Sequence, residues 1–172
     1  MPDEFVIEDD ALAPKGYILI DYKGMNPFSI YAKMRDILLT IFRAGGKDFF
    51  EDDFRWDLTT EPVGFFVNVH VERKFDKWTK YYIFVRLQGK QPKDPSKPGW
   101  IQVEISGKVI TKYPTETLLQ KAIFYPFLFS YHYLIYNNIR RRYLGIHNER
   151  IEQLEKEIRS TFGMTQRIGT IL

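Results

Sequence analysis

The sequence of 172 residues contains no cysteine, which excludes disulfides, thiolate catalysis and cysteine-ligated zinc or iron–sulfur sites. Histidine is scarce as well: the sequence has three, His70, His132 and His147. The glycines match no phosphate-binding loop, and no internal repeat is evident. We therefore expect no catalytic residue, no metal site and no cofactor, and we favour a protein that is not an enzyme.

The sequence also lacks an export signal and an uninterrupted apolar stretch. Residues 1–10 are acidic and carry no apolar core of a signal, so we expect a cytoplasmic location. The one candidate membrane span, residues 118–139, is interrupted by Lys121, Pro126 and His132. A spanning helix needs about 20 predominantly apolar residues, so a membrane partner is not favoured.

The composition is that of a globular chain, with 44% hydrophobic and 27% charged residues. We expect one domain over residues 1–172, with residues 1–14 flexible and residues 146–172 forming a C-terminal helix and tail. A net charge of +3 permits a nucleic-acid partner but does not favour one. Aromatic residues make up 16% of the chain, which indicates a thick core, a stacking surface or an aromatic-lined cavity.

Four segments alternate apolar and polar residues with a period of two, as antiparallel strands with one face on a core do. They lie at residues 54–58, 63–71, 81–87 and 101–109. An earlier apolar run at 16–22 predicts a further strand. Apolar residues at helical spacing follow Asn26 and Pro27, which predicts a helix that stops at Gly45 and Gly46.

The last third of the chain has a helical pattern, and Pro126 is expected to kink it. Beyond Gly145, the apolar residues Ile151, Leu154, Ile158 and Phe162 form a narrow stripe that resembles a short coiled-coil seam. We favour docking of this helix on its own domain over such a seam. The expected fold class is α+β: a single antiparallel meander sheet of about five strands, one N-terminal helix and a long, proline-kinked C-terminal helical segment.

This order of elements resembles the helix-grip fold of START-like and pollen-allergen-like lipid-binding domains. The resemblance rests on element order over most of the chain. Helix-grip domains typically place two short helices after the first strand and six strands after those, whereas this sequence predicts one helix and four strands. The resemblance implies a ligand held between the sheet and the final helix.

The even-numbered positions of the strands form a second face that is half aromatic and half charged. Its candidate ligand-binding residues are Phe66, His70, Tyr82, Phe84, Arg86 and Trp100. Three interpretations are open: a solvated face with cross-strand pairs, a surface for a small molecule, and a platform that stacks the bases of single-stranded nucleic acid. Glutamates in the same patch weaken the nucleic-acid interpretation.

Two groups of residues on the strands are of types found in catalytic or metal sites. His70 and Glu72 are typical of a general base and its orienting carboxylate. The sequence spacing places no nucleophile beside them, so a structural role is favoured. Residues 51–53 are all acidic, and we interpret them as a solvated start of a strand rather than a cation site. A hairpin turn at residues 74–77 predicts Glu72 opposite Lys80 and His70 opposite Tyr82.

Residues 124–139 are apolar and aromatic almost all the way round, so something must cover them. Tyr131, His132 and Tyr133 occupy successive directions of this segment and either line a cavity or satisfy one another in a dry core. The cations that follow suit the C-terminal end of a helix, or contact with an anionic ligand group. These candidate anion-binding residues are Arg140, Arg141 and Arg142.

The sequence therefore favours a non-enzymatic binding protein. Its ligand is an apolar or aromatic small molecule between the sheet and the aromatic C-terminal helix. The alternative from another class is a homodimer that assembles through the C-terminal helices. Single-stranded nucleic acid on the polar-aromatic face of the sheet is the third hypothesis.

Overall fold

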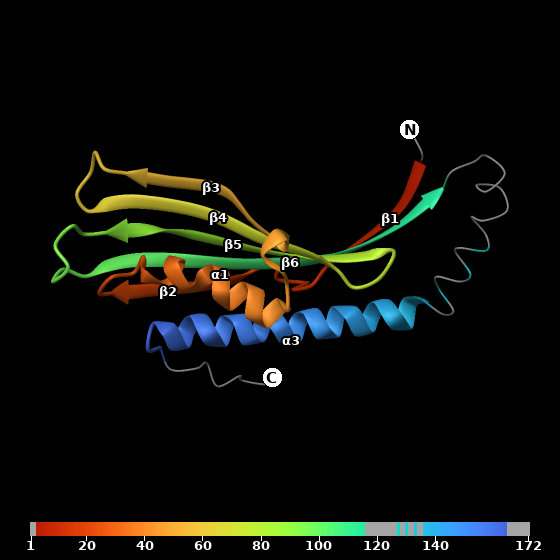
Figure 1. Cartoon of the computed structure of the whole chain (residues 1–172). Coiled ribbons are helices and arrows are strands. Elements are labelled where there is room, and N and C mark those ends of the chain that lie inside the picture. The colour runs from red at the N-terminus through yellow and green to blue at the C-terminus, as the bar shows by residue number, and fades with distance from the viewer. Residues whose placement is uncertain (1–2, 116–126, 128–129, 131–132, 134–135, 165–172) are drawn as a thin grey trace.

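In the computed structural model, six antiparallel strands form one sheet, and two helices lie on one side of it (Figure 1). The structure describes residues 3–115, 127, 130, 133 and 136–164. The elements, in chain order, are β1 (Asp3–Asp10), β2 (Ile18–Gly24), α1 (Ser29–Phe42), the short 3₁₀ helix η1 (Gly46–Asp48), β3 (Phe49–Asp57), β4 (Val63–Lys74), β5 (Thr79–Gln91), β6 (Gly99–Thr115) and α3 (Asn137–Thr161). The α+β class and the meander are as expected.

Strands β3, β4, β5 and β6 follow one another as a meander, and β1 and β2 both pair with the outer edge of β6. The two lie end to end on that edge, because β1 faces residues 108–115 of β6 and β2 faces residues 99–105. The Ala11 amide continues the ladder to the Gly107 carbonyl over 2.9 Å. Together β1 and β2 thus act as one interrupted edge strand.

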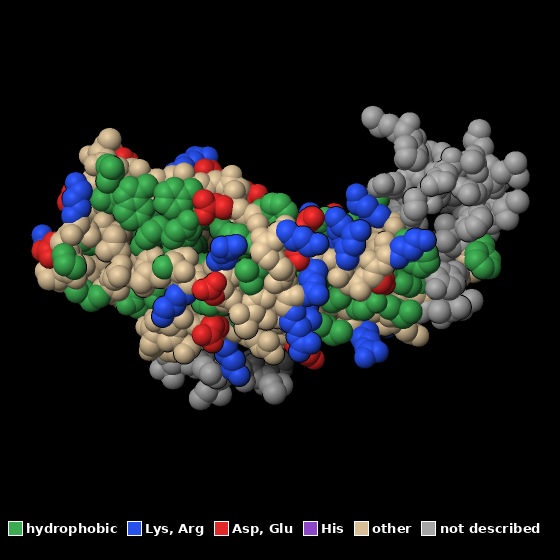
Figure 2. All heavy atoms as spheres, in the orientation of Figure 1, with side chains coloured by type: hydrophobic (Ala, Val, Ile, Leu, Met, Phe, Trp, Pro, Cys, Tyr) green, Lys and Arg blue, Asp and Glu red, His purple; other side chains and the backbone are tan. Residues whose placement is uncertain are grey.

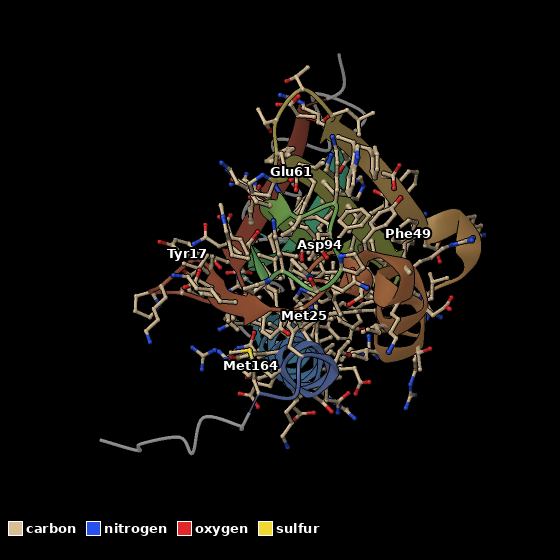
Figure 3. The ribbon with its side chains drawn as sticks, turned by 90° about the vertical axis from the view of Figure 1, so that its left-hand side faces the viewer. Tyr17, Met25, Phe49, Glu61, Asp94 and Met164 are labelled. Atoms are coloured by element: carbon tan, nitrogen blue, oxygen red, sulfur yellow. The ribbon has the colours of Figure 1, made fainter. Side chains whose placement is uncertain are left out.

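The apolar odd-numbered positions of β4, β5 and β6 face the helices, which confirms the period-two prediction. Their side chains are at most 4% exposed: Val63, Phe65, Val67, Val69, Val71, Tyr81, Ile83, Val85, Leu87, Ile101, Val103, Ile105 and Val109. Figure 3 looks along α3 and shows the sheet arching over both helices, with Tyr17 and Phe49 at its two sides. Burial of this one apolar face holds the layers together.

The apolar stripe of α3 packs into the core of its own domain. Ile151, Leu154 and Ile158 are fully buried in the core beneath the sheet. Phe162, just beyond the helix, stacks on Tyr22 of β2 with ring centroids 4.3 Å apart. The expectation that this stripe docks on its own domain is therefore confirmed, and these three side chains are not available for a seam between subunits.

Two boundaries of α1 differ from the prediction. Asn26 has a positive φ of 46° and starts a turn, so the helix begins at Ser29 rather than at Pro27. The helix ends at Phe42 because Arg43 adopts the left-handed conformation and its amide bonds back into the last turn. A local turn residue decided each boundary, and the glycines come after the helix has already ended.

Strand β1 lies in the stretch 1–14, for which the sequence predicts flexibility and no element. The hairpin turn after β4 is at residues 75–78, one residue later than predicted, so the pairing differs by two residues: Glu72 lies opposite Tyr82 and His70 opposite Phe84. A shift of two keeps each side chain on its predicted face.

The C-terminal segment before α3 is described only in part. Pro126 and most of residues 118–139 lie outside the described residues, so the kink stays a prediction. Among the helices that the structure describes, none combines the length and the hydropathy needed to cross a membrane.

Figure 2 shows hydrophobic side chains gathered at the left of the molecule, over β3 and α1. In this region the Phe28 ring contacts those of Tyr31, Phe54, Trp56 and Phe65, with centroids 4.7–6.3 Å apart. Phe54 and Trp56 face the helices, as their alternation with Arg55 predicts. These rings fasten the edge strand β3 to the start of α1.

Candidate ligand-binding face of the sheet

The even-numbered positions of β4, β5 and β6 point away from α1 and α3, and their side chains are half-buried or exposed. Among the described residues, no helix covers this face, which we call the open face. All six candidate sheet residues lie on it, but in two groups. His70, Tyr82, Phe84 and Arg86 are neighbours in the centre, and Phe66 lies toward the end of the sheet with Trp100.

Four rings form a continuous row across the open face. Phe50 of β3 stacks on His70 of β4, with centroids 4.8 Å apart and planes 13° apart. His70 contacts Phe84 of β5 at 5.5 Å, and Phe84 stacks parallel to Tyr82 at 6.2 Å. We call these four residues the aromatic row. Strand register produces it, because Phe50, His70 and Phe84 are directly opposite one another on adjacent strands.

A cation lies over one end of this row. The Lys108 ammonium is 6.0 Å from the Tyr82 ring and 5.8 Å from the Phe84 ring, within the range of a cation–π contact. Lys108 also pairs with Glu8 at 3.2 Å. Burial, together with the Glu72 carboxylate, raises the pKa of the Tyr82 hydroxyl, so this ring remains neutral at physiological pH.

His70 is oriented by Asp52 and not by Glu72. Its Nδ1 lies 2.6 Å from the Asp52 carboxylate, whereas Glu72 pairs with Lys80 at 3.5 Å. A β-bulge between Glu51 and Asp53 shifts the strand register at Asp52. Ser106, a hydroxyl two strands away, is separated from His70 by Phe84. The contact between Asp52 and His70 therefore fixes the orientation of the His70 ring within the aromatic row.

The acidic run at 51–53 is divided among three partners. Glu51 accepts a hydrogen bond of 2.6 Å from the Tyr31 hydroxyl, and this bond raises the pKa of Tyr31 to about 12. Asp52 binds His70, and Asp53 forms an ion pair of 2.6 Å with Arg55. Throughout the described part of the chain, no three ligating side chains are grouped as a metal site would need.

A depression of about 180 Å³ adjoins the aromatic row. Its walls include Phe84, Asn68 and Ser106, and a cation and an anion meet in it. Arg86 forms an ion pair of 3.3 Å with Glu104 and donates a longer bond of 3.4 Å to Asn68. The depression thus offers an aromatic wall beside both hydrogen-bond donors and acceptors.

Phe66 and Trp100 line a second depression, of about 260 Å³, near the β3–β4 connection. The Arg55 guanidinium lies over the Phe66 ring at 5.5 Å, and Trp100 is 37% exposed. Gly89 lines the same depression and has no room for a side chain, since an added Cβ would lie 2.2 Å from the Trp100 carbonyl oxygen.

The helical half of the expected site is separate from the sheet half. Tyr131 and His132 lie outside the described residues, and Tyr133 is 63% exposed. Helix α3, which follows them, packs on the face opposite to the aromatic row. Among the described residues, the open face is therefore a site of the sheet alone.

The three arginines have different environments. Arg140 donates to both carboxylate oxygens of Asp9, at 2.9 and 3.1 Å, and to the Asn137 side chain, so it fastens α3 to β1. Arg141 and Arg142 are exposed. Arg140 is thus engaged within the chain, which leaves two of the three predicted anion-binding residues on the surface.

Sequence reasoning missed Phe50 and Asp52 as parts of the open face. Both fall before residue 54, where the alternation that predicts the strand begins, and the bulge breaks the period at this point. Two consecutive phenylalanines at 49 and 50 are the one signal that a longer strand was present.

A further groove of about 1060 Å³ lies between β2 and α3. It is lined by three cations and four carboxylates: Lys15, Lys156 and Arg159, and Asp21, Glu149, Glu152 and Glu155. Arg159 and Glu155 pair at 2.8 Å. Because carboxylates outnumber cations in the groove and Tyr17 is its one aromatic side chain among the described residues, we do not place the site there.

No protein-family model matches this chain, and no curated protein matches it. A solved structure, that of the protein of unknown function SA2116 from Staphylococcus aureus, is similar over 86% of this chain and 94% of that chain. The TM-score is 0.27 and the sequence identity 7%, so the similarity carries no functional argument.

Proposed function

We propose that this chain is a non-enzymatic binding protein for an aromatic small molecule that lies on the open face. The observation that carries the proposal is the aromatic row of Phe50, His70, Phe84 and Tyr82, beside a polar depression. Planar rings stack on such a row, and the polar groups beside it fix the orientation of the ligand.

The partners of the rings support this proposal. Asp52 holds His70 in place, and the Lys108 ammonium lies over Tyr82 and Phe84, so the stacking surface is fixed before a ligand arrives. A pre-organised surface loses less conformational entropy on binding. Arg86 and Glu104 lie beside it and can exchange their mutual contact for contacts with polar edges of a ligand.

The interior is a less favourable place for the ligand. The core side chains beneath the sheet, such as Val67, Leu87 and Leu154, are fully buried in one cluster that includes α3. The helix-grip likeness of the element order is in keeping with a binding role, but we place the ligand on the opposite side of the sheet. A cytoplasmic location belongs to the same proposal.

The test is an NMR titration of the ¹⁵N-labelled full chain with adenosine, a planar probe with polar edges and no charge. We expect backbone amide shifts confined to residues 50–52, 68–72, 82–86 and 104–108. The variant Phe84→Ala should lose these shifts, whereas Tyr17→Ala, a change to an aromatic residue 52% exposed and outside the open face, should keep them. Shifts that persist in Phe84→Ala would overturn the proposal.

A second candidate function is assembly into a homodimer. Phe127 and Tyr133 are 64% and 63% exposed, and Ile139 at the start of α3 is 38% exposed. Large apolar side chains exposed within one short stretch of the chain favour a protein contact. Light scattering at low micromolar concentration tests this candidate: a dimer that dissociates in a Phe127→Ser, Tyr133→Ser variant supports it, and a monomer in the unmodified chain removes it.

A further inference from the structure

A pocket of about 180 Å³ opens where the β4–β5 turn meets β6. Four lysines line it together with two aromatic side chains and one isoleucine: Lys74, Lys77, Lys80, Lys112, Trp78, Tyr82 and Ile110. No carboxylate is among the described residues that line it. We call it the lysine pocket. Figure 2 shows lysine and arginine side chains gathered in the region of this turn and the start of α3.

The lysines are arranged at a cost in stability. Lys74 and Lys80 are directly opposite each other on β4 and β5, and like charges in that position repel. Glu72 offsets the charge of Lys80, at 3.5 Å. Lys74 and Lys77 form no ion pair with any residue that the structure describes, and the Lys77 ammonium lies over the Trp78 ring at 5.8 Å. The pocket therefore carries positive charge that the described side chains do not neutralise.

The turn that carries these lysines is held rigidly. One carboxylate oxygen of Asp76 accepts hydrogen bonds of 2.8 Å from the amides of Trp78 and Thr79. The other accepts a bond of 2.9 Å from the Tyr136 hydroxyl, at the start of α3. Asp76 is thus engaged on the helix side of the turn. Its bonds fix the backbone from which Lys74 and Lys77 project.

The lysine pocket and the aromatic row share one residue. Tyr82 is a wall of the pocket and the end of the row, and Lys108 lies over its ring. A molecule that stacks on the row can therefore extend an anionic group into the pocket. Several lysines around one space suit a group with more than one negative charge, as phosphate has, because each ammonium is a compact point charge with three donors.

We infer that the lysine pocket binds the phosphate of the ligand on the open face, which makes that ligand a phosphorylated aromatic small molecule. This inference rests on the proposed function for the aromatic part of the ligand. It also assigns the anion to a different place from Arg140, Arg141 and Arg142, the first of which Asp9 already engages.

The test is isothermal titration calorimetry of the full chain at physiological salt with three probes: ATP, adenosine and tripolyphosphate. The variant Lys74→Gln, Lys77→Gln removes two lysines of the pocket, and Lys33→Gln, Lys97→Gln removes two exposed lysines elsewhere. We expect the first variant to weaken ATP and tripolyphosphate by at least about tenfold and to leave adenosine unchanged. The second should leave all three affinities unchanged.

The outcomes separate this inference from the proposed function. Tripolyphosphate that does not bind, or that binds equally to both variants, overturns the lysine pocket, even where adenosine still binds to the open face. If tripolyphosphate binds in a lysine-dependent way and adenosine does not bind, the result supports the lysine pocket and overturns the proposal of an aromatic ligand. An oligothymidylate whose affinity rises steeply with length and exceeds that of ATP would overturn the small-molecule ligand in favour of single-stranded nucleic acid.

Discussion

The ring of His147, on α3, donates a hydrogen bond of 3.1 Å from Nε2 to the backbone carbonyl of Tyr82, on β5. His147 is fully buried, and burial lowers the pKa of its ring to about 4. Its Nδ1 has no hydrogen-bond partner within the described chain. This neutral histidine joins the C-terminal helix to the strand that carries Tyr82 and Phe84 on its other face.

Gly107 makes room for that contact. A Cβ added at this position would lie 2.8 Å from His147 Nε2 and 2.9 Å from Ile151 Cδ1. We expect Gly107→Ala to lower the free energy of unfolding by about 1–3 kcal/mol through overpacking, as measured by urea denaturation. The control is Gly145→Ala, in the interior of α3 with nothing within 4 Å of its added Cβ. That change should instead stabilise the chain by about 0.5–1 kcal/mol.

Stability should fall in mild acid because of His147. The unfolded chain binds a proton near pH 6.5, whereas the folded chain binds it only near pH 4, so the folded state is fully favoured above pH 6.5. As the pH falls from 6.5 toward 4, unfolding takes up a proton and stability is lost. The expected loss is about 3 kcal/mol, read from urea midpoints across this range.

The variant His147→Leu isolates this contribution. Its urea midpoint should change less between pH 6.5 and pH 4 than that of the unmodified chain. Burial acts to raise the pKa of Asp76, but amide and hydroxyl bonds favour its charged form and together leave the pKa below its usual value. Its contribution is therefore lost only below about pH 4. An equal pH slope in both proteins would show that His147 does not titrate on unfolding.

The hydroxyl group of Tyr136, and not its ring alone, should stabilise the folded chain. Its hydroxyl donates to Asp76 over 2.9 Å and contacts Thr79, and the residue is 2% exposed. Tyr136→Phe removes one hydrogen-bond partner from each of these two buried or half-buried groups, so we expect a loss of about 1–3 kcal/mol in the free energy of unfolding. Tyr17→Phe removes an exposed hydroxyl and should have no measurable effect. Equal thermal midpoints for the two variants would contradict the role of Asp76 in docking α3.

The two faces of the sheet should respond differently to the same added charge. Val69→Asp places a carboxylate at a site that is 1% exposed and apolar, and we expect a loss of more than about 4 kcal/mol, which leaves the chain largely unfolded. Asn68→Asp places one on the open face, where Arg86 is a neighbour, and should change stability little. Circular dichroism of both variants at 25 °C checks the difference. A folded Val69→Asp chain would invert the assignment of faces.

The sheet and its faces could be predicted because they depend on a short repeat. Valines at 63, 67, 69 and 71 define one face whatever their partners are, so the faces remain correct even though the turn at 75–78 shifted the pairing by two residues. The stripe of Ile151, Leu154 and Ile158 predicted the docking of α3 for a similar reason.

Long-range pairing was less visible in the sequence. Strand β1 is acidic at both of its ends, and its partner is about a hundred positions away in β6, so no local pattern identifies it. The bulge at Asp52 breaks the alternation that the prediction of β3 used. The order of Phe50, His70 and Phe84 across three strands depends on that bulge and on the register, which is why the aromatic row was predicted only in part.

The sequence did not predict the lysine pocket because this pocket, too, depends on long-range strand pairing. Lys74, Lys77 and Lys80 are close in the sequence, but it is the pairing of Lys74 with Lys80 and the approach of Lys112 on β6 that bring them into one pocket. Arg140, Arg141 and Arg142 are consecutive, which made them the more visible candidates.

The most direct measurement is a crystal structure of the full chain grown or soaked with ATP. We predict density for the adenine ring stacked on Phe84 or Tyr82, with the phosphates among Lys74, Lys77 and Lys80. Density for the nucleotide in the groove between β2 and α3, or an open face left empty while calorimetry records binding, would contradict the account.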